Sequence, residues 1–147
     1  MTAPRRIVTG FDVDGRSVVS IDGSLGNART LRPGHESFVV WTTESVPADL
    51  GDTTDGADRL VGRNLPDGTV FRITTYEPGV ESAPHRTDSV DYAVVIAGEI
   101  DMVLDEQTVH LRAGDVVVQR GTCHDWRNDG SEPCVIAFCL VGATPRS

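Results

Sequence analysis

Hydrophobic and polar residues alternate along much of this chain in short stretches, which are separated by turn residues. Alternation with a period of two predicts β-strands with one buried face, and short strands at regular spacing predict a sandwich or barrel. The predicted strands cover residues 5–11, 17–21, 37–42, 70–76, 90–97, 100–104, 108–112, 116–119, 124–127 and 135–141. We therefore predict an all-β fold with little helix.

No segment shows a clear helix pattern, although residues 47–50 and 55–60 could each form a single helical turn. Both lie within residues 43–64, a polar stretch rich in Gly, Asp and Thr that is either a long surface loop or a lid over a site. A length of 147 residues fits one domain. Within it, we expect residues 70–147 to form the barrel core, with residues 1–69 contributing N-terminal strands and a loop that pack on it.

Composition and charge exclude several classes of protein. Acidic residues outnumber basic ones by 22 to 13, and the net charge of −9 argues against a nucleic-acid partner, because phosphate contacts need clustered Lys and Arg. No apolar run approaches the roughly 18 residues of a membrane span, and the N-terminus shows no apolar core of a secretory signal. The three cysteines lie in apolar, strand-like surroundings and are expected to be reduced. A cytoplasmic location is the simplest expectation.

Three polar residues in the second half have the chemistry of a reactive site. Alternate residues of a strand share a face, so Asp91 points with Ala93 and Val95, and His124 points with Trp126. If these faces line the barrel interior, Asp91 and His124 converge with His85. Two imidazoles and one carboxylate form the facial ligand set of non-haem Fe(II), and they also suit Mn, Ni, Co or Zn.

Two sequence motifs around these residues resemble those of the cupin superfamily. In the first, Gly79, His85 and Gly98 match, while Thr87 stands at the position of a second His and Asp91 at that of a Glu. The second motif is matched by Gly114, Gly121, His124 and Asn128, with Gln119 where Pro is usual. The resemblance covers residues 70–141. It implies a single cupin-type barrel, that is, a double-stranded β-helix or jelly roll, with extra N-terminal strands.

Residues of the site follow from this resemblance and from the strand faces. We expect His85, Asp91 and His124 to be catalytic and to bind a divalent metal ion, with Asp88 as the competing carboxylate. The alternative is a site without metal, in which a histidine acts as acid or base. The expected substrate pocket contains Thr87, Trp126, Tyr76 and Arg72. His110 is expected in a surface hairpin and His35 in a turn, so neither is assigned to the site.

The resemblance implies a range of activities rather than one, because cupin folds carry many reactions. We favour lyase-type chemistry, namely decarboxylation, dehydration or isomerisation of a small oxygenated acid or ketone in the tailoring of a metabolite. One alternative is an Fe(II)-dependent dioxygenase, and another is a module that binds a small molecule without turnover. We also expect a homodimer, in which the extra strands of residues 1–42 cover an exposed sheet edge.

Overall fold

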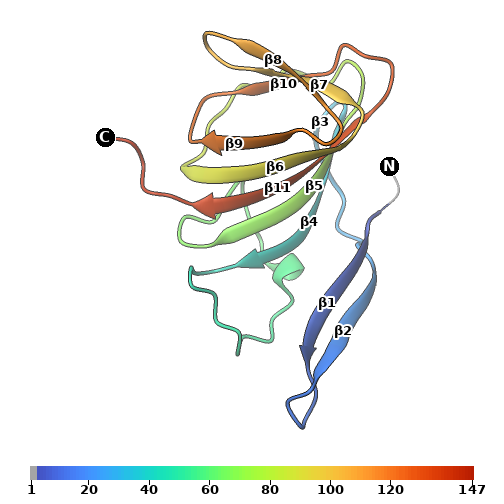
Figure 1. The fold of residues 1–147 in the computed structure, drawn as a ribbon, viewed down its shortest axis with the longest axis vertical. Coiled ribbons are helices and arrows are strands. Elements are labelled where there is room, and N and C mark those ends of the chain that lie inside the picture. Colours follow the sequence, from blue (N-terminus) through green and yellow to red (C-terminus); the bar gives the residue numbers. More distant parts are fainter. Residues whose placement is uncertain (1–2) are drawn as a thin grey trace.

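In the computed structural model, which describes residues 3–147, the regular secondary structure is almost entirely β-strand (Figure 1). The elements are β1 (Arg5–Phe11), β2 (Ser17–Ser24), β3 (Arg29–Arg32), β4 (His35–Thr43), η1 (Gly56–Asp58), β5 (Thr69–Tyr76), β6 (Ser89–Ala97), β7 (Glu99–Val103), β8 (Thr108–Arg112), β9 (Val116–Arg120), β10 (Asp125–Arg127) and β11 (Cys134–Gly142). Met1 and Thr2 lie outside the described residues. The prediction that the N-terminus carries no secretory signal falls partly on these two residues. The predicted all-β fold is confirmed.

The helical predictions had mixed outcomes. Within 55–60, η1 forms a single 3₁₀ turn, and the side chain of Asp55 caps it by accepting from the backbone N–H of Ala57. The turn predicted at 47–50 is wrong, because the Ser45 hydroxyl binds the carbonyl of Pro47 and local turns replace the helical pattern. No helix in residues 3–147 is long and apolar enough to cross a membrane.

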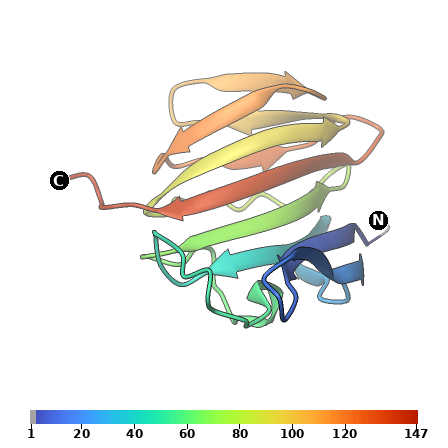
Figure 2. The ribbon, with the colours of Figure 1, turned by 60° about the horizontal axis from the view of Figure 1, so that its bottom comes forward.

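Two sheets face each other and enclose the core (Figure 2). The larger sheet has the order β3-β4-β5-β11-β6-β9, and the smaller has the order β10-β7-β8. Strand β3 was not predicted, because its four residues, which begin and end with an arginine, are too few to show alternation. The buried cluster combines both sheets, with Ile100, Met102, Leu111 and Trp126 from the smaller sheet and Val70, Val95, Ile136, Phe138 and Leu140 from the larger.

The chain passes from the larger to the smaller sheet at Gly98, between β6 and β7. Gly98 has a φ of 76°, in the left-handed region that favours glycine. A Cβ at this position would also collide with the carbonyl oxygen of Pro133. Glycine is therefore required for the corner that brings the smaller sheet over the larger.

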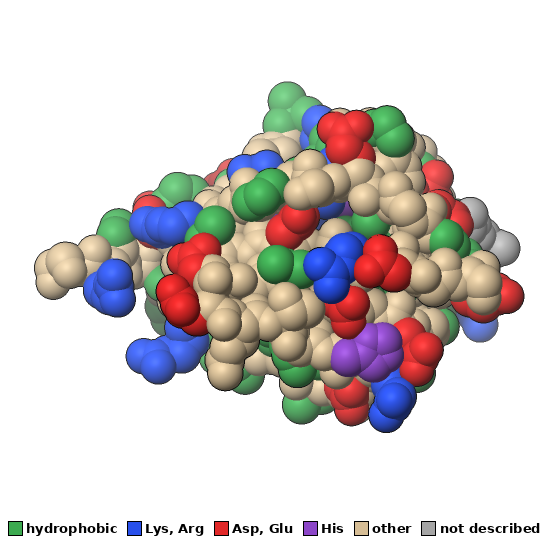
Figure 3. All heavy atoms as spheres, turned by 90° about the horizontal axis from the view of Figure 1, so that it is seen from above, with side chains coloured by type: hydrophobic (Ala, Val, Ile, Leu, Met, Phe, Trp, Pro, Cys, Tyr) green, Lys and Arg blue, Asp and Glu red, His purple; other side chains and the backbone are tan. Residues whose placement is uncertain are grey.

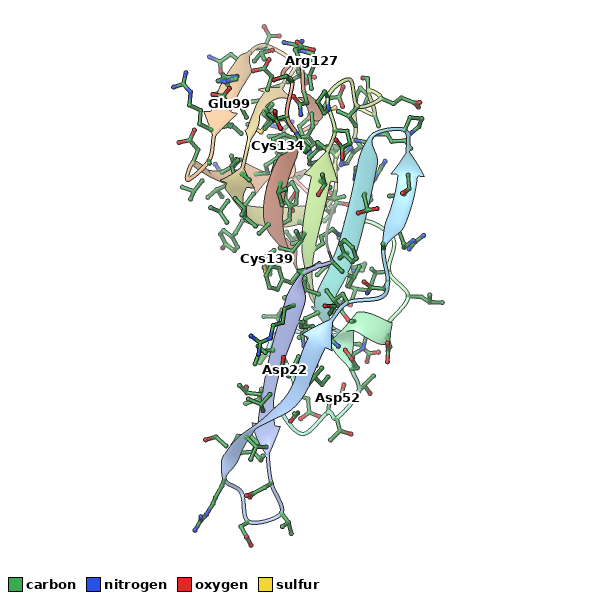
Figure 4. All side chains as sticks on the ribbon, turned by 90° about the vertical axis from the view of Figure 1, so that its right-hand side faces the viewer. Asp22, Asp52, Glu99, Arg127, Cys134 and Cys139 are labelled. Atoms are coloured by element: carbon green, nitrogen blue, oxygen red, sulfur yellow. The ribbon has the colours of Figure 1, made fainter. Side chains whose placement is uncertain are left out.

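Strands β1 and β2 form a separate two-stranded sheet, called here the hairpin, which extends away from the barrel (Figures 1 and 4). Its base is attached through Arg6, which forms an ion pair of 2.7 Å with Asp55 and donates to the carbonyl of Val40. No strand of the hairpin pairs with either sheet of the barrel among the described residues. Few contacts therefore hold the hairpin against the barrel.

Candidate functional site

A cavity of about 320 Å³ opens inside the barrel between the two sheets. This volume is in the range of a small-molecule site. All the residues predicted for the site line it: Arg72, Tyr76, His85, Thr87, Asp91, His124 and Trp126. Asp88, the competing carboxylate, is not among the lining residues and instead pairs with Arg86 at 2.8 Å on the surface. The strand faces read from alternation therefore lead to one cavity.

His85 and His124 lie side by side because their backbones form an isolated antiparallel bridge. The N–H of each residue donates to the carbonyl of the other at 3.0 Å. Antiparallel partners place their side chains on the same face, so the two imidazoles are neighbours. Their ring centroids are 4.6 Å apart, and the ring planes are inclined at 59°.

Both imidazoles are fixed in the same tautomer. Nδ1 of His85 lies 2.8 Å from the carbonyl oxygen of Ala83, and Nδ1 of His124 lies 2.8 Å from that of Thr122. Because a carbonyl can only accept, each Nδ1 carries the proton, and each Nε2 retains a lone pair in the neutral ring. Burial lowers the pKa of His85 below its usual value, so this ring is neutral at pH 7. Its Nε2 is then ready to take a proton or bind a metal.

Asp91 points into the barrel from β6 and is buried. Its Oδ1 accepts a 2.6 Å hydrogen bond from the Ser89 hydroxyl, which lies 2.7 Å from the hydroxyl of Thr87. Because Ser89 gives its one proton to Asp91, Thr87 must donate to Ser89. Burial raises the pKa of Asp91, and the Ser89 hydrogen bond opposes this shift. Asp91 is thus a buried carboxylate fixed by a short chain of hydroxyls.

Arg72 places a cation in the cavity wall from β5. One of its terminal nitrogens donates to the carbonyls of Gly62 and Arg63, at 2.8 and 2.9 Å. Its Nε is buried and has no hydrogen-bond partner among residues 3–147. Burial lowers the pKa of Arg72. An unsatisfied buried N–H of a cation is a favourable donor for a bound carboxylate.

The polar stretch 43–64 reaches the cavity at Arg63, which lines it together with Arg32. Between its ends, Arg59 forms ion pairs with Asp52 and Glu44. These contacts hold the stretch in place on the protein surface. Sequence reasoning did not assign Arg32 or Arg63 to the site, because both lie in segments that show no strand alternation.

His35 was expected in a turn, and this placement is wrong. The turn ends at Gly34, whose φ is 80°, and His35 is the first residue of β4, opposite Tyr76. It lines the cavity with 8% of its surface exposed and packs edge-on against Tyr76 at 5.5 Å. Its Nδ1 is buried without a partner among the described residues, and burial lowers its pKa to about 4. Alternation with Ser37 was the signal that could have placed it.

Trp126 and His110 lie where the sequence predicted them, in the cavity wall and on the surface. Trp126 is 2% exposed and contacts both Tyr76 and His124, so it belongs to the core and to the cavity wall. His110 lies on the surface, away from the cavity lining, and pairs with Asp101 at 2.8 Å.

The donor chemistry around the cavity suits a divalent metal only in part. Two imidazole Nε2 atoms are available, but Thr87 replaces a third imidazole, and the Oδ1 of Asp91 is engaged by Ser89. In the part of the chain that the structure describes, no group of three or more His, Cys, Asp or Glu residues is arranged to hold a metal ion. The three residues thus do not form a ready ligand set. Metal binding by His85, Asp91 and His124 stays a prediction.

Comparison with known proteins agrees with this architecture. The model of the Cupin_2 family, described as a cupin domain, matches residues 72–141. Two solved structures share the fold. The first, the polyketide cyclase RemF from Streptomyces resistomycificus, has a TM-score of 0.56 and 20% identity, and the match covers 82% of this chain and 76% of that one. KdgF from Halomonas sp. has a TM-score of 0.52 and 17% identity, covering 82% of this chain and 87% of that one.

Curated relatives match over most of the chain. The phomopsin biosynthesis cluster protein C' of Diaporthe leptostromiformis is 39% identical over 136 residues, which are 87% of this chain and 72% of that protein. The cupin-domain-containing oxidoreductase fogC of Aspergillus ruber is 37% identical over 145 residues, which are 92% of this chain and 71% of that protein. With the barrel and both histidine motifs in place, these matches show that the chain belongs to the cupin superfamily.

Proposed function

We propose that this cupin is an enzyme that moves protons on a small oxygenated acid or ketone, in a decarboxylation, dehydration or isomerisation. One observation carries the proposal: two adjacent imidazoles with free Nε2 atoms line the same cavity as Arg72, whose buried Nε lacks a partner among the described residues. The cavity thus combines acid–base groups with a donor for a carboxylate.

Arg72 binds the substrate in this proposal. Its Nε donates to a carboxylate or carbonyl oxygen, while the carbonyls of Gly62 and Arg63 hold the guanidinium in place. Arg32 and Arg63 add positive charge to the same wall. A cavity of about 320 Å³ admits a small acid or ketone and its neighbouring groups.

The histidine pair performs the proton transfer. In an isomerisation, one Nε2 takes a proton from a carbon next to the carbonyl, and the imidazolium returns a proton at the product position. In a dehydration, the proton taken from carbon is balanced by one given to the departing hydroxyl, which leaves as water. In a decarboxylation, the imidazolium gives its proton to the carbon that loses CO₂. Because the ring centroids are 4.6 Å apart, a positive charge on His124 lowers the pKa of His85 and favours the free lone pair at its Nε2. Asp91, fixed by Ser89, stabilises the imidazolium that forms.

The names of relatives support a place in secondary metabolism. Two matching proteins are described as members of the phomopsin biosynthesis cluster and one as a member of the oryzines biosynthesis cluster. We extend this setting to the present chain as part of the proposal.

A second candidate is an oxidoreductase, such as an Fe(II)-dependent dioxygenase. Four relatives are described as cupin-domain-containing oxidoreductases, with identities of 37%, 28%, 29% and 30%. This activity requires O₂ and a redox-active metal held by His85, His124 and a further ligand, for which Asp91 is the candidate. Metal content and O₂ uptake separate the two candidates.

The test is an assay of purified protein with a panel of small oxo and hydroxy acids in D₂O. Deuterium incorporation, CO₂ release and O₂ uptake are measured with and without a chelator, and metal content is determined on the same sample. Turnover without O₂ uptake supports the proposal, and its persistence in chelator assigns the reaction to the side chains. Iron with O₂ uptake supports the oxidoreductase. Binding of acids without any turnover makes the protein a binding module and contradicts the proposal.

A further inference from the structure

Large exposed hydrophobic side chains concentrate on two surfaces of this protein. The first is the outer face of the larger sheet, which carries Phe71, Tyr92, Val94, Ile96, Val116 and Val118. The second is the hairpin, which carries Ile7, Phe11, Val13, Val18 and Val19. Clustered exposed apolar residues mark a surface that another molecule covers, whereas single ones are ordinary.

The outer face is continuous across four strands. In β-pairing, Cys139 of β11 stands between Phe71 of β5 and Tyr92 of β6, and Tyr92 in turn faces Val118 of β9. Paired residues share a face and neighbouring strands lie about 4.8 Å apart, so this row spans roughly 14 Å. A parallel row runs through Ala137, Val94 and Val116.

The chain covers its own sheet only as far as β4. Phe38 of β4 shares the outer face with its partner Ile73, but it is only 3% exposed. The segment between the hairpin and β3 lies close to β4, where Asn27 donates to the carbonyl of Val39 and Leu25 is buried. Phe71, on the next strand, is 40% exposed. Cover from the same chain therefore ends between β4 and β5.

The hairpin also has exposed apolar side chains, and it has few neighbours in its own chain to cover them. An isolated two-stranded hairpin is marginally stable at best in water. Phe11 is 70% exposed and Val13 is 98% exposed, and the ion pair of Arg6 with Asp55 holds only the base. Figure 4 shows the hairpin, marked by Asp22, extending beyond the barrel.

We propose that a second copy of this chain covers both surfaces: the hairpin of each copy lies on the outer sheet face of its partner, around a two-fold axis. The area argues for this occupant. One hairpin face of about 25 Å by 10 Å, covered by a partner of another kind, would bury far less than the roughly 800 Å² per partner of a standard interface. With a second copy, two-fold symmetry makes the contact twice, so each copy buries a hairpin face and an equal area of sheet. The total is then about 1,000 Å², which reaches the lower limit of a specific interface.

The opposite end of the barrel contrasts with these surfaces. Over β7 and β8, acidic and basic side chains are mixed (Figure 3), and they include the ion pairs of Arg112 with Glu99 and of Arg127 with Asp101. That end is well suited to contact with water. The proposal thus gives the predicted homodimer a specific interface, which uses the face of the sheet instead of its edge. It does not depend on the proposed function.

The experiment compares two double variants with a matched control in the full-length chain. Phe11→Glu with Val19→Glu places charge on the hairpin, and Tyr92→Lys with Val118→Lys places charge on the sheet face. Val109→Glu is the control, because Val109 is 41% exposed but lies on β8. Sedimentation equilibrium of the unchanged chain should give twice the 15.8 kDa mass of one copy, each double variant should give a single copy, and the control should remain dimeric.

Mixing the two double variants is the decisive step. In a mixed dimer, the glutamates of one hairpin meet the lysines of the partner face, and the other contact consists of unchanged residues. The mixture should therefore recover the dimer mass, whereas neither variant does alone. Circular dichroism verifies that every variant is folded. A monomeric unchanged chain, a dimer that survives either double variant, or a mixture that stays monomeric would each overturn the proposal.

Discussion

The backbone amides of His85 and His124 each donate to the carbonyl of the other residue at 3.0 Å, and this bridge sets the two rings 4.6 Å apart. The bridge uses no side-chain atom. Replacement of either imidazole therefore leaves the strand contact in place and removes only the ring chemistry. Substitutions at these two positions are for this reason good probes of the reaction.

His85→Gln and His124→Gln should each lower kcat by at least about 100-fold, the range expected for loss of a general acid–base group. The measurement is steady-state turnover of the substrate found with the acid panel. His110→Gln is the control, since His110 lies on the surface and pairs with Asp101 outside the cavity. Full turnover in His85→Gln would show that the imidazole pair is not the site of proton transfer.

Arg72→Met should raise KM about 10- to 100-fold and change kcat less, because a hydrogen bond between charged groups contributes about 1.5–3 kcal/mol to binding. Arg72→Lys should restore only part of the affinity, since an ammonium lacks the planar guanidinium donors. Arg112→Met serves as control at an exposed arginine that pairs with Glu99. An unchanged KM in Arg72→Met contradicts the assignment of Arg72 to the carboxylate.

The two candidate carboxylates can be separated by Asp91→Asn and Asp88→Asn. Asp91 lines the cavity and accepts from Ser89, whereas Asp88 is on the surface beside Arg86. We expect Asp91→Asn to lower kcat at least about tenfold and Asp88→Asn to leave it unchanged. If the purified protein contains metal, Asp91→Asn should also lower the metal content measured by mass spectrometry. The reverse pattern would place Asp88 in the site.

His35 predicts a pH dependence of stability. Its pKa is lowered from 6.5 to about 4 by burial, so the unfolded chain binds this proton more readily than the folded one. Stability is therefore present above pH 6.5 and is lost as the pH falls towards 4. Between pH 7 and pH 5, His35 should reduce the free energy of unfolding by about 2 kcal/mol.

Urea unfolding of the unchanged chain and of His35→Gln at both pH values measures this contribution as a difference between the two proteins. Glutamine removes the titration while keeping a polar side chain. An equal loss of stability in both proteins between pH 7 and pH 5 would show that His35 does not titrate in this range.

Much of the barrel could be predicted from the sequence, because alternation identifies strands and their inward faces. Asp91 and Trp126 were placed in the cavity in this way. His35 was missed because the Pro33–Gly34 turn signal was extended over it, although the strand begins at that residue. Arg63 lies at the end of an irregular stretch, where no periodicity indicates which way a side chain points.

The separate hairpin illustrates another limit. Its strands at 5–11 and 17–24 follow from local pattern, and the first matches its predicted bounds. What lies against these strands is a long-range property that alternation does not encode. The apolar outer positions of β6, such as Tyr92, look like ordinary exposed residues of a half-buried strand until the neighbouring strands are known.

The slender attachment of the hairpin at Arg6 and Asp55 has a consequence for thermal unfolding. If a partner molecule supplies the missing cover, part of each chain's folding free energy comes from association and obeys mass action. The melting temperature then rises with protein concentration, and dilution loosens the hairpin before the barrel unfolds. Hydrogen exchange should follow the same order, with the amides of β1 and β2 exchanging faster in dilute solution while those of β5 and β11 stay protected.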